Sequence, residues 1–270
     1  MFVFVILLYY YRSMNNKTSL LKPLTLVSYI LMVVVNALAN ILPINNVTTG
    51  GVSDSYPNLF APAGITFSIW GLIYLLLGGY VLYQLTSKKI NRNISVPVNT
   101  WFIVSSLVNS VWIFAWHYRV MWATVLLMLA LLGSLIRIAD TLGKEKLNNS
   151  DKFLYKIPFG VYFGWITVAT IANITAFLVS LGWNGFGLPE STWMIVVLCT
   201  GFVIATWRMQ KDCNIAYGLV PVWAYFGIWF KHTSTNGFNG SYPTVIITVL
   251  IGIALLLLSN IALVVRKKVI

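Results

Sequence analysis

Indole rings and side-chain amides recur at helical spacing inside the apolar stretches of this chain. Asn109 and Trp112 are three residues apart, and Trp165 and Asn173 are eight apart, so each pair falls on one face of an expected helix. A buried indole N–H or amide needs a hydrogen-bond partner, and hydrocarbon offers none. We therefore expect these side chains to face other helices or a bound molecule rather than lipid.

A third pair, Trp70 and Tyr74, is four residues apart in an earlier stretch, so it also shares a helix face, and it completes a predicted ligand-binding set. Each member offers a ring face or a neutral hydrogen-bonding group, so the set is a candidate for the wall of a ligand pocket. The alternative is that the rings and amides serve helix packing only. The predicted set is Trp70, Tyr74, Asn109, Trp112, Trp165 and Asn173.

Other kinds of chemistry lack the residues they need. None of the six acidic residues falls in the middle of an expected membrane span, which argues against ion-coupled transport and against hydrolysis by paired carboxylates. No nucleotide-binding glycine motif is present. Two cysteines and two distant histidines predict no metal site, and no catalytic residue or cofactor is expected. A single axial haem contact by His117 is kept as a minor alternative.

The helices that would position these residues follow from hydropathy. The chain has 270 residues, of which 59% are hydrophobic and 9% charged, and its mean hydropathy is +0.82. These values predict an all-α, polytopic helical bundle in a lipid bilayer. Eight spans are expected near Leu24–Leu42, Pro62–Leu85, Val98–Trp116, Met121–Ile136, Ile157–Leu181, Thr192–Trp207, Ile215–Phe230 and Thr244–Val264.

The net charge of +12 reflects membrane topology rather than a nucleic-acid partner. With eight spans and both termini in the cytoplasm, 16 of the 18 basic residues fall inside and only Arg119 and Lys231 fall outside. We therefore predict a multi-pass protein of the cell membrane with both termini cytoplasmic. The apolar segment Phe2–Tyr11 is too short to span and is interpreted as an over-extended start before Met14 or as a short interfacial segment.

Several features outside the predicted set have two interpretations each. The first outer loop, Pro43 to Ala61, has the composition of a structured loop and is either functional or a connector. Gly160 and Gly164 allow a close helix contact, either internally or in a homodimer. Trp101, Trp122, Trp183 and Trp193 at span ends suggest interfacial anchors.

Three motifs give the chain a resemblance to the TspO/MBR family of tryptophan-rich sensory or translocator proteins. Pro62, Trp70 and Tyr74 match the family's proline and Trp-x-x-x-Tyr pattern, and Asn109 and Trp112 match its Asn-x-x-Trp. Residues 165–173 match its Trp-x-Thr-x-Ala-Thr-x-x-Asn. The string Ala61-Pro62-Ala63-Gly64 lacks the second proline and the tryptophan that usually follow there.

The resemblance implies five transmembrane helices, a long first loop and a pocket for porphyrins and other flat hydrophobic molecules. It covers residues 24–183, so we expect a cytoplasmic segment at 1–23, a TspO-like core at 24–183 and a three-helix extension at 184–270. The favoured function is a sensor or carrier for a flat hydrophobic ligand such as a tetrapyrrole. The alternatives are an accessory or assembly subunit, for example of a permease complex, and the porphyrin degradation proposed for the family.

Overall fold

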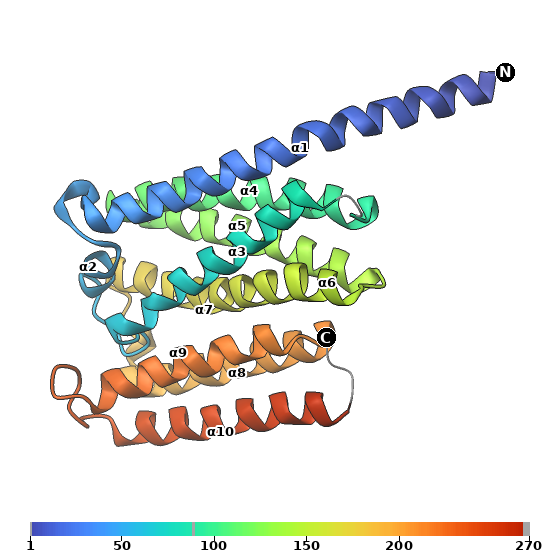
Figure 1. The fold of residues 1–270 in the computed structure, drawn as a ribbon. Coiled ribbons are helices and arrows are strands. Elements are labelled where there is room, and N and C mark those ends of the chain that lie inside the picture. Colours follow the sequence, from blue (N-terminus) through green and yellow to red (C-terminus); the bar gives the residue numbers. More distant parts are fainter. Residues whose placement is uncertain (1, 88–89, 267–270) are drawn as a thin grey trace.

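A computed structural model shows a bundle of long helices, and it describes residues 2–87 and 90–266. No strand occurs in these ranges, so the predicted all-α class is confirmed. Neighbouring helices run mostly antiparallel, and the start of α1 and the end of α10 lie toward the same end of the bundle (Figure 1). The long helices are α1 (Phe2–Ile41), α3 (Ile69–Thr86), α4 (Arg92–His117), α5 (Met121–Lys144), α7 (Ile157–Ser180), α8 (Glu190–Asp212), α9 (Ile215–Thr233) and α10 (Pro243–Val265).

Short elements connect these helices. Beyond the first helix come a 3₁₀ turn at Ile44–Asn46, helix α2 (Thr49–Asp54) and a 3₁₀ turn at Gly64–Ser68. Helix α6 (Asn149–Asp151) and a π turn at Lys152–Lys156 lead into α7, and a 3₁₀ turn at Gly185–Gly187 precedes α8. The expected N-terminal segment before Leu24 is continuous with the first span, because α1 begins at Phe2.

Seven helices in the described part of the chain are long and apolar enough to cross a membrane, which confirms a multi-pass bundle. Eight such spans were expected, and the exception is α9. Its 19 residues include Pro221, Lys231 and His232, which lower its mean hydropathy. Nevertheless α9 runs alongside α8 and α10 over a similar length (Figure 1). The sixth span also continues past the predicted Trp207 to Asp212.

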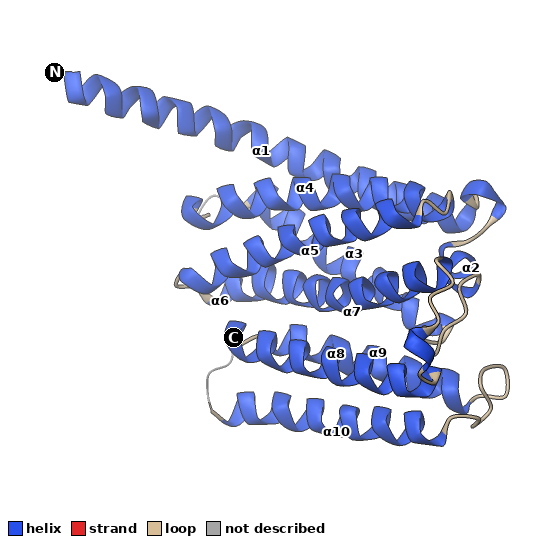
Figure 2. Ribbon diagram, turned by 180° about the vertical axis from the view of Figure 1, so that it is seen from behind, coloured by secondary structure: helices blue, strands red, loops and turns tan. Residues whose placement is uncertain are grey.

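Two hydrophobic cores lie on either side of α7. The larger core joins α1, α3, α4, α5 and α7 and also includes Met209, Tyr217, Val220 and Leu263 from the last three helices, and the smaller one joins α8, α9 and α10 with Leu59, Phe60 and Val168. Helix α7 contacts α3 and α5 on one side and α9 on the other. Figure 2 shows α8, α9 and α10 as a layer beneath the rest of the bundle. We refer to α8–α10 as the C-terminal extension.

Small residues bring α7 and α9 close together. A Cβ atom on Gly164 would lie 2.8 Å from the backbone oxygen of Tyr217, and one on Gly160 would lie 2.5 Å from the amide nitrogen of Asn214. Both distances are shorter than a normal contact, and because the neighbour of Gly164 is backbone, that position requires glycine for this approach. The glycine pair therefore serves an internal contact with α9, one of its two predicted uses.

Buried charges join the C-terminal ends of α5 and α8. The Arg208 guanidinium is 4% exposed and donates to Asp140 of α5 at 2.8 Å and to Asp212 at 2.7 Å. Its carbon also lies 5.0 Å from the centroid of the Phe163 ring on α7. Because a buried guanidinium needs compensating charge, the two carboxylates make this contact stable. The C-terminal basic residues Lys267 and Lys268, like Lys88 and Lys89, lie outside the described residues.

Candidate ligand-binding site

A small cavity lies where α3, α4 and α7 meet beneath the first outer loop. Its volume is about 70 Å³. Four of the six predicted residues line it, Trp70 from α3, Trp112 from α4, and Trp165 and Asn173 from α7. The chain thus brings three separate sequence motifs to one cavity. We call it the tryptophan cavity.

Aromatic rings give the cavity its walls. Trp70 meets the edge of Trp165 with ring centroids 6.3 Å apart, and it stacks on Tyr74 at 5.5 Å. On the opposite helix, Trp112 stacks on Trp116 at 5.4 Å. Rings in these geometries contribute packing energy, and they also present flat faces to whatever lies between them.

Two predicted residues do not line the cavity. Tyr74 lies behind Trp70, and its backbone carbonyl accepts a hydrogen bond of 2.9 Å from the Tyr29 hydroxyl of α1. Asn109 is fully buried, and its carbonyl oxygen accepts a 2.7 Å hydrogen bond from the Asn36 amide of α1. Tyr74 and Asn109 therefore contact neighbouring side chains and do not border the cavity.

Unpartnered polar atoms are frequent in the predicted residues, and four of these atoms belong to residues that line the tryptophan cavity. Eleven buried side-chain nitrogen or oxygen atoms of the described residues have no hydrogen-bond partner, and six of them belong to the predicted set. A buried polar group without a partner costs about 1 to 3 kcal/mol, so such groups normally indicate a function. The six atoms are the Tyr74 hydroxyl, the Asn109 amide nitrogen, the indole nitrogens of Trp112 and Trp165, and both amide atoms of Asn173.

The loop between α1 and α3 closes one end of the cavity. Thr49, Ser53, Asn58, Ala61 and Pro62 all line it. Side chains hold this loop in shape, because the Thr48 hydroxyl accepts from the Gly51 amide at 3.1 Å and Asn58 accepts from the Ala61 amide at 2.9 Å. The loop is therefore a structured cover, as its turn-forming composition predicts.

The extension holds the far end of this cover. In α9, the Trp223 indole donates to the Thr66 carbonyl at 3.0 Å, and the Gly227 carbonyl accepts from the Ala63 amide at 3.0 Å. His232 pairs through Nε2 with the Leu59 carbonyl at 2.9 Å. Helix α9 thus covers the segment that precedes α3.

Sequence reasoning missed some of the lining. Met128 from α5 and Phe67 from the turn before α3 both border the cavity. Phe67 meets the Trp165 ring at 6.0 Å, edge to face. Neither residue stands in a recognisable motif, and only its tertiary position reveals it. Trp116 also lines the cavity, and its position seven residues after Asn109 and four after Trp112 places it on the same helix face, which was the one sequence feature that could have indicated it.

His117 is not available as a haem ligand. It is fully buried, its Nδ1 lies 3.0 Å from the Ile44 carbonyl and its Nε2 lies 3.1 Å from the Thr49 hydroxyl. Because both ring nitrogens already have partners, the axial contact held open by the sequence is not supported. Across the described residues, no group of three His, Cys, Asp or Glu side chains could hold a metal ion.

Comparison with known proteins gives one match. A family model described as TSPO-like protein matches residues 22–262. None of the curated proteins and none of the solved structures matches the chain. The family match continues through α8 and α9 and nearly all of α10, beyond residue 183, where the motif-based resemblance ended.

Proposed function

The chain belongs to the TSPO-like protein family, and from this premise we propose that it is a membrane sensor or carrier for a flat hydrophobic ligand of the tetrapyrrole class. The ligand would bind in the tryptophan cavity, between the indoles of Trp70, Trp112 and Trp165. The proposal makes the three motifs parts of one site.

The unpartnered polar atoms carry this proposal. Helix packing alone would account for the ring contacts, but it leaves both amide atoms of Asn173 and the indole nitrogens of Trp112 and Trp165 without partners. A ligand with acceptors at its edge could accept hydrogen bonds from the indole and amide N–H groups, and its flat apolar centre could pack against the rings. Neutral donors of this kind bind without requiring a charge to be desolvated.

The size of the cavity sets a condition on binding. At about 70 Å³ it is smaller than the roughly 300 to 1,000 Å³ of most small-molecule pockets. A macrocycle could fit only if the cover formed by Thr49–Pro62 moved outward. Loops of this kind are the least stable parts of a fold, so we propose that ligand binding selects an open form of the cover.

Substitution of the facing indoles tests the site. In protein purified in detergent, quenching of tryptophan fluorescence by a porphyrin should follow a saturable curve. Trp70→Leu and Trp165→Leu should each weaken affinity at least tenfold, because each removes a stacking face. Trp122→Leu is the matched control, since Trp122 is 62% exposed on α5 and does not line the cavity.

Unchanged affinity in both cavity variants, with helical content retained, would disprove the site. A wild-type protein that binds no porphyrin at all would instead favour the accessory or assembly subunit, in which the rings serve packing alone. Comparing product formation in light and dark would test the enzymatic alternative. The residues that line the cavity include no carboxylate, thiol, imidazole or amine for acid–base or nucleophilic chemistry.

For orientation, we propose that both termini face the cytoplasm of a cell membrane and that the tryptophan cavity opens outward. The support is the excess of basic residues in the connections on the terminal side. Reporter fusions at Asn46 and at the C-terminal end should report opposite sides of the membrane. If both fusions reported the same side, the proposed topology would be wrong.

A further inference from the structure

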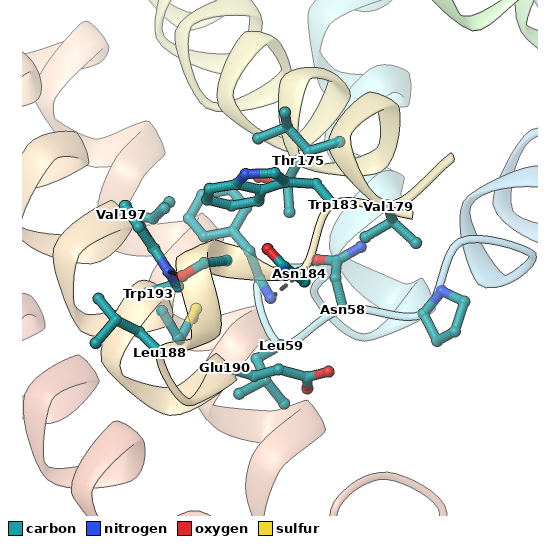
Figure 3. A pocket seen from close by; sticks show the side chains of 15 residues that line it. Asn58, Leu59, Thr175, Val179, Trp183, Asn184, Leu188, Glu190, Trp193 and Val197 are labelled. Carbon is teal, nitrogen blue, oxygen red and sulfur yellow. Dashed lines mark hydrogen bonds between the residues drawn. The ribbon is translucent and has the colours of Figure 1, made fainter. Parts of the chain in front are cut away.

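A second and larger cavity lies between the TspO-like core and the C-terminal extension. Its volume is about 310 Å³, within the range of small-molecule pockets. Figure 3 shows side chains from three segments around it, the loop before α3, the end of α7 and the start of α8. Asn58 borders both this cavity and the tryptophan cavity, so the segment that follows Asn58 separates them.

Two indoles form the aromatic part of this cavity. The Trp183 and Trp193 rings have centroids 4.9 Å apart and are inclined at 60°. The Trp193 indole nitrogen donates to the Gly185 carbonyl at 2.6 Å, which fixes that ring against the turn. Gly185 has a φ of +64°, and a Cβ there would lie 2.8 Å from the indole nitrogen, so the turn needs glycine. These two tryptophans therefore contact each other and together form one wall of the cavity.

A single charged side chain borders the cavity. Glu190, the first residue of α8, is the only ionisable group among the lining residues, and no basic side chain accompanies it. Within the described residues its carboxylate has no ion pair or side-chain hydrogen bond. The remaining surface is mainly aliphatic and includes Leu178, Val197 and Met194.

We propose that this cavity binds a hydrophobic organic cation. The apolar body of the cation would lie among the aliphatic side chains, and its positive charge would sit near the Glu190 carboxylate and the indole faces. Indole is the strongest cation–π partner among the side chains, and a carboxylate that lines the same cavity adds charge complementarity. The site is separate from the tryptophan cavity, and it does not depend on the function proposed there.

A matched pair of probes tests the charge preference. Tetraphenylphosphonium and tetraphenylborate have nearly the same shape and opposite charges. In uncharged lipid nanodiscs, corrected for binding to empty discs, equilibrium dialysis should show saturable binding of about one phosphonium per chain and much weaker binding of borate. Equal binding of the two probes by the protein would overturn the proposal.

Substitution of the carboxylate tests its role. Glu190→Gln should weaken phosphonium binding at least fivefold, whereas Asp54→Asn should leave it unchanged. Asp54 is a suitable control because it is also an outer acidic residue, and it is exposed and absent from the lining. Because Glu190 is exposed, its substitution should not impair folding. If Glu190→Gln bound the phosphonium as tightly as the wild type, the assigned role of the carboxylate would be wrong.

Filling the cavity locates the binding. Val197 lines the cavity, whereas the adjacent Val196 is 47% exposed and does not line it, so the two positions form a control pair. Val197→Phe should abolish phosphonium binding, and Val196→Phe should not. Neither variant should alter porphyrin quenching, which reports on the tryptophan cavity. Retained phosphonium binding in folded Val197→Phe would place the cation elsewhere and reject this site.

Discussion

At the scale of single residues, the hydrogen-bond partners of buried polar atoms distinguish structural side chains from those that are candidates for binding a ligand. Asn36 and Asn109 share one hydrogen bond, which satisfies the oxygen of Asn109 and leaves its amide nitrogen unpartnered. Asn173 has no partner for either amide atom. Since an unpartnered buried amide destabilises the fold, Asn173 is the clearest case of a residue whose position favours binding over stability.

Substituting Asn173 should therefore move stability and affinity in opposite directions. Asn173→Leu removes both unpartnered atoms at similar volume, so we expect the free energy of unfolding to rise by about 1 kcal/mol. Porphyrin affinity should fall at least tenfold. Thermal denaturation and fluorescence quenching of the same sample would measure the two effects.

Asn36→Leu provides the contrasting control, because it leaves the Asn109 oxygen without its donor. We expect it to lower stability by about 1 to 3 kcal/mol. If Asn173→Leu also lowered stability, its amide must already have a partner, and the argument from unpartnered atoms would not hold for this residue.

The chemistry of the candidate site was largely predictable from residue types and spacing. Each predicted pair lies on one face of its own helix, and Trp70, Trp112, Trp165 and Asn173 from three helices line one cavity. Tyr74 and Asn109 lie on those faces too, but each is one layer back, because a helix face is wider than the cavity it borders. Met128 and the loop residue Thr49 could not be predicted, since their approach depends on how the chain folds back over the bundle.

At the scale of elements, α7 is held by close backbone approach to α9. Gly164→Ala should place a methyl group about 2.8 Å from the Tyr217 backbone oxygen, as the position of the Cβ shows. Backbone cannot yield as a flexible side chain can, so we expect a loss of about 1 to 3 kcal/mol in stability. Gly133→Ala on α5 is the control, because nothing lies within 4 Å of its Cβ. That variant should be neutral or stabilising by up to about 1 kcal/mol.

Chemical unfolding in mixed micelles would measure both glycine variants. Equal stabilities for Gly164→Ala and Gly133→Ala would show that α7 and α9 are not in close contact in the folded protein. The glycine pair would then be free to serve a contact between two copies of the chain.

The charged contact between α5 and α8 should also be essential for stability. Arg208→Leu leaves Asp140 and Asp212 without their shared partner, and removing one side of a buried pair typically costs about 3 to 5 kcal/mol. Because Asp140 is 34% exposed, we expect the lower end of that range. Lys211→Leu, with a lysine that is 46% exposed, should cost less than about 1 kcal/mol. Thermal stability of the two variants that did not differ would contradict a structural role for the pair.

Long apolar elements were predictable as membrane spans, and the stretch expected at Ile215–Phe230 forms helix α9 (Ile215–Thr233) without being as apolar as the other seven described helices. Hydropathy identified the stretches that became α1, α3, α4, α5, α7, α8 and α10, since a run of about 20 apolar residues has few alternatives. Helix α9 is different because its polar tyrosine hydroxyls bond to neighbouring helices, as the bonds from Tyr217 to Thr167 and from Tyr225 to the Leu198 carbonyl show. Sequence hydropathy cannot register such tertiary partners.

At the scale of the whole molecule, two hydrophobic cores meet along α7, and two cavities lie at the end of the bundle that holds the loop before α3. The tryptophan cavity belongs to the core, and the larger cavity lies between the core and the extension. The extension also fixes the cover of the first cavity through the bonds from α9 to residues 59–66. Although the boundary at residue 183 stays a prediction, α8–α10 do more than lengthen the bundle, because their contacts reach the candidate site.

This arrangement predicts binding without active accumulation. Moving a solute uphill requires a second source of free energy, usually coupled through titrating groups or bound ions along the path. The tryptophan cavity is lined by aromatic rings, amides, hydroxyls and aliphatic groups without an ionisable side chain, and Arg208 and its two carboxylates, which lie at the opposite end of the bundle, are already paired. Neutral groups can shift a conformational equilibrium through differential affinity, but they cannot respond to a proton gradient near neutral pH.

In reconstituted vesicles, porphyrin binding should therefore be the same with and without an imposed pH or Na⁺ gradient, and no concentrative uptake should occur. Vesicles that contain the Trp165→Leu variant would show how much porphyrin simply partitions into lipid. Accumulation that required a gradient and disappeared on addition of an ionophore would instead make the protein a secondary transporter. In that case a coupling group would have to be sought among the paired charges at the opposite end of the bundle, because the lining of the tryptophan cavity offers none.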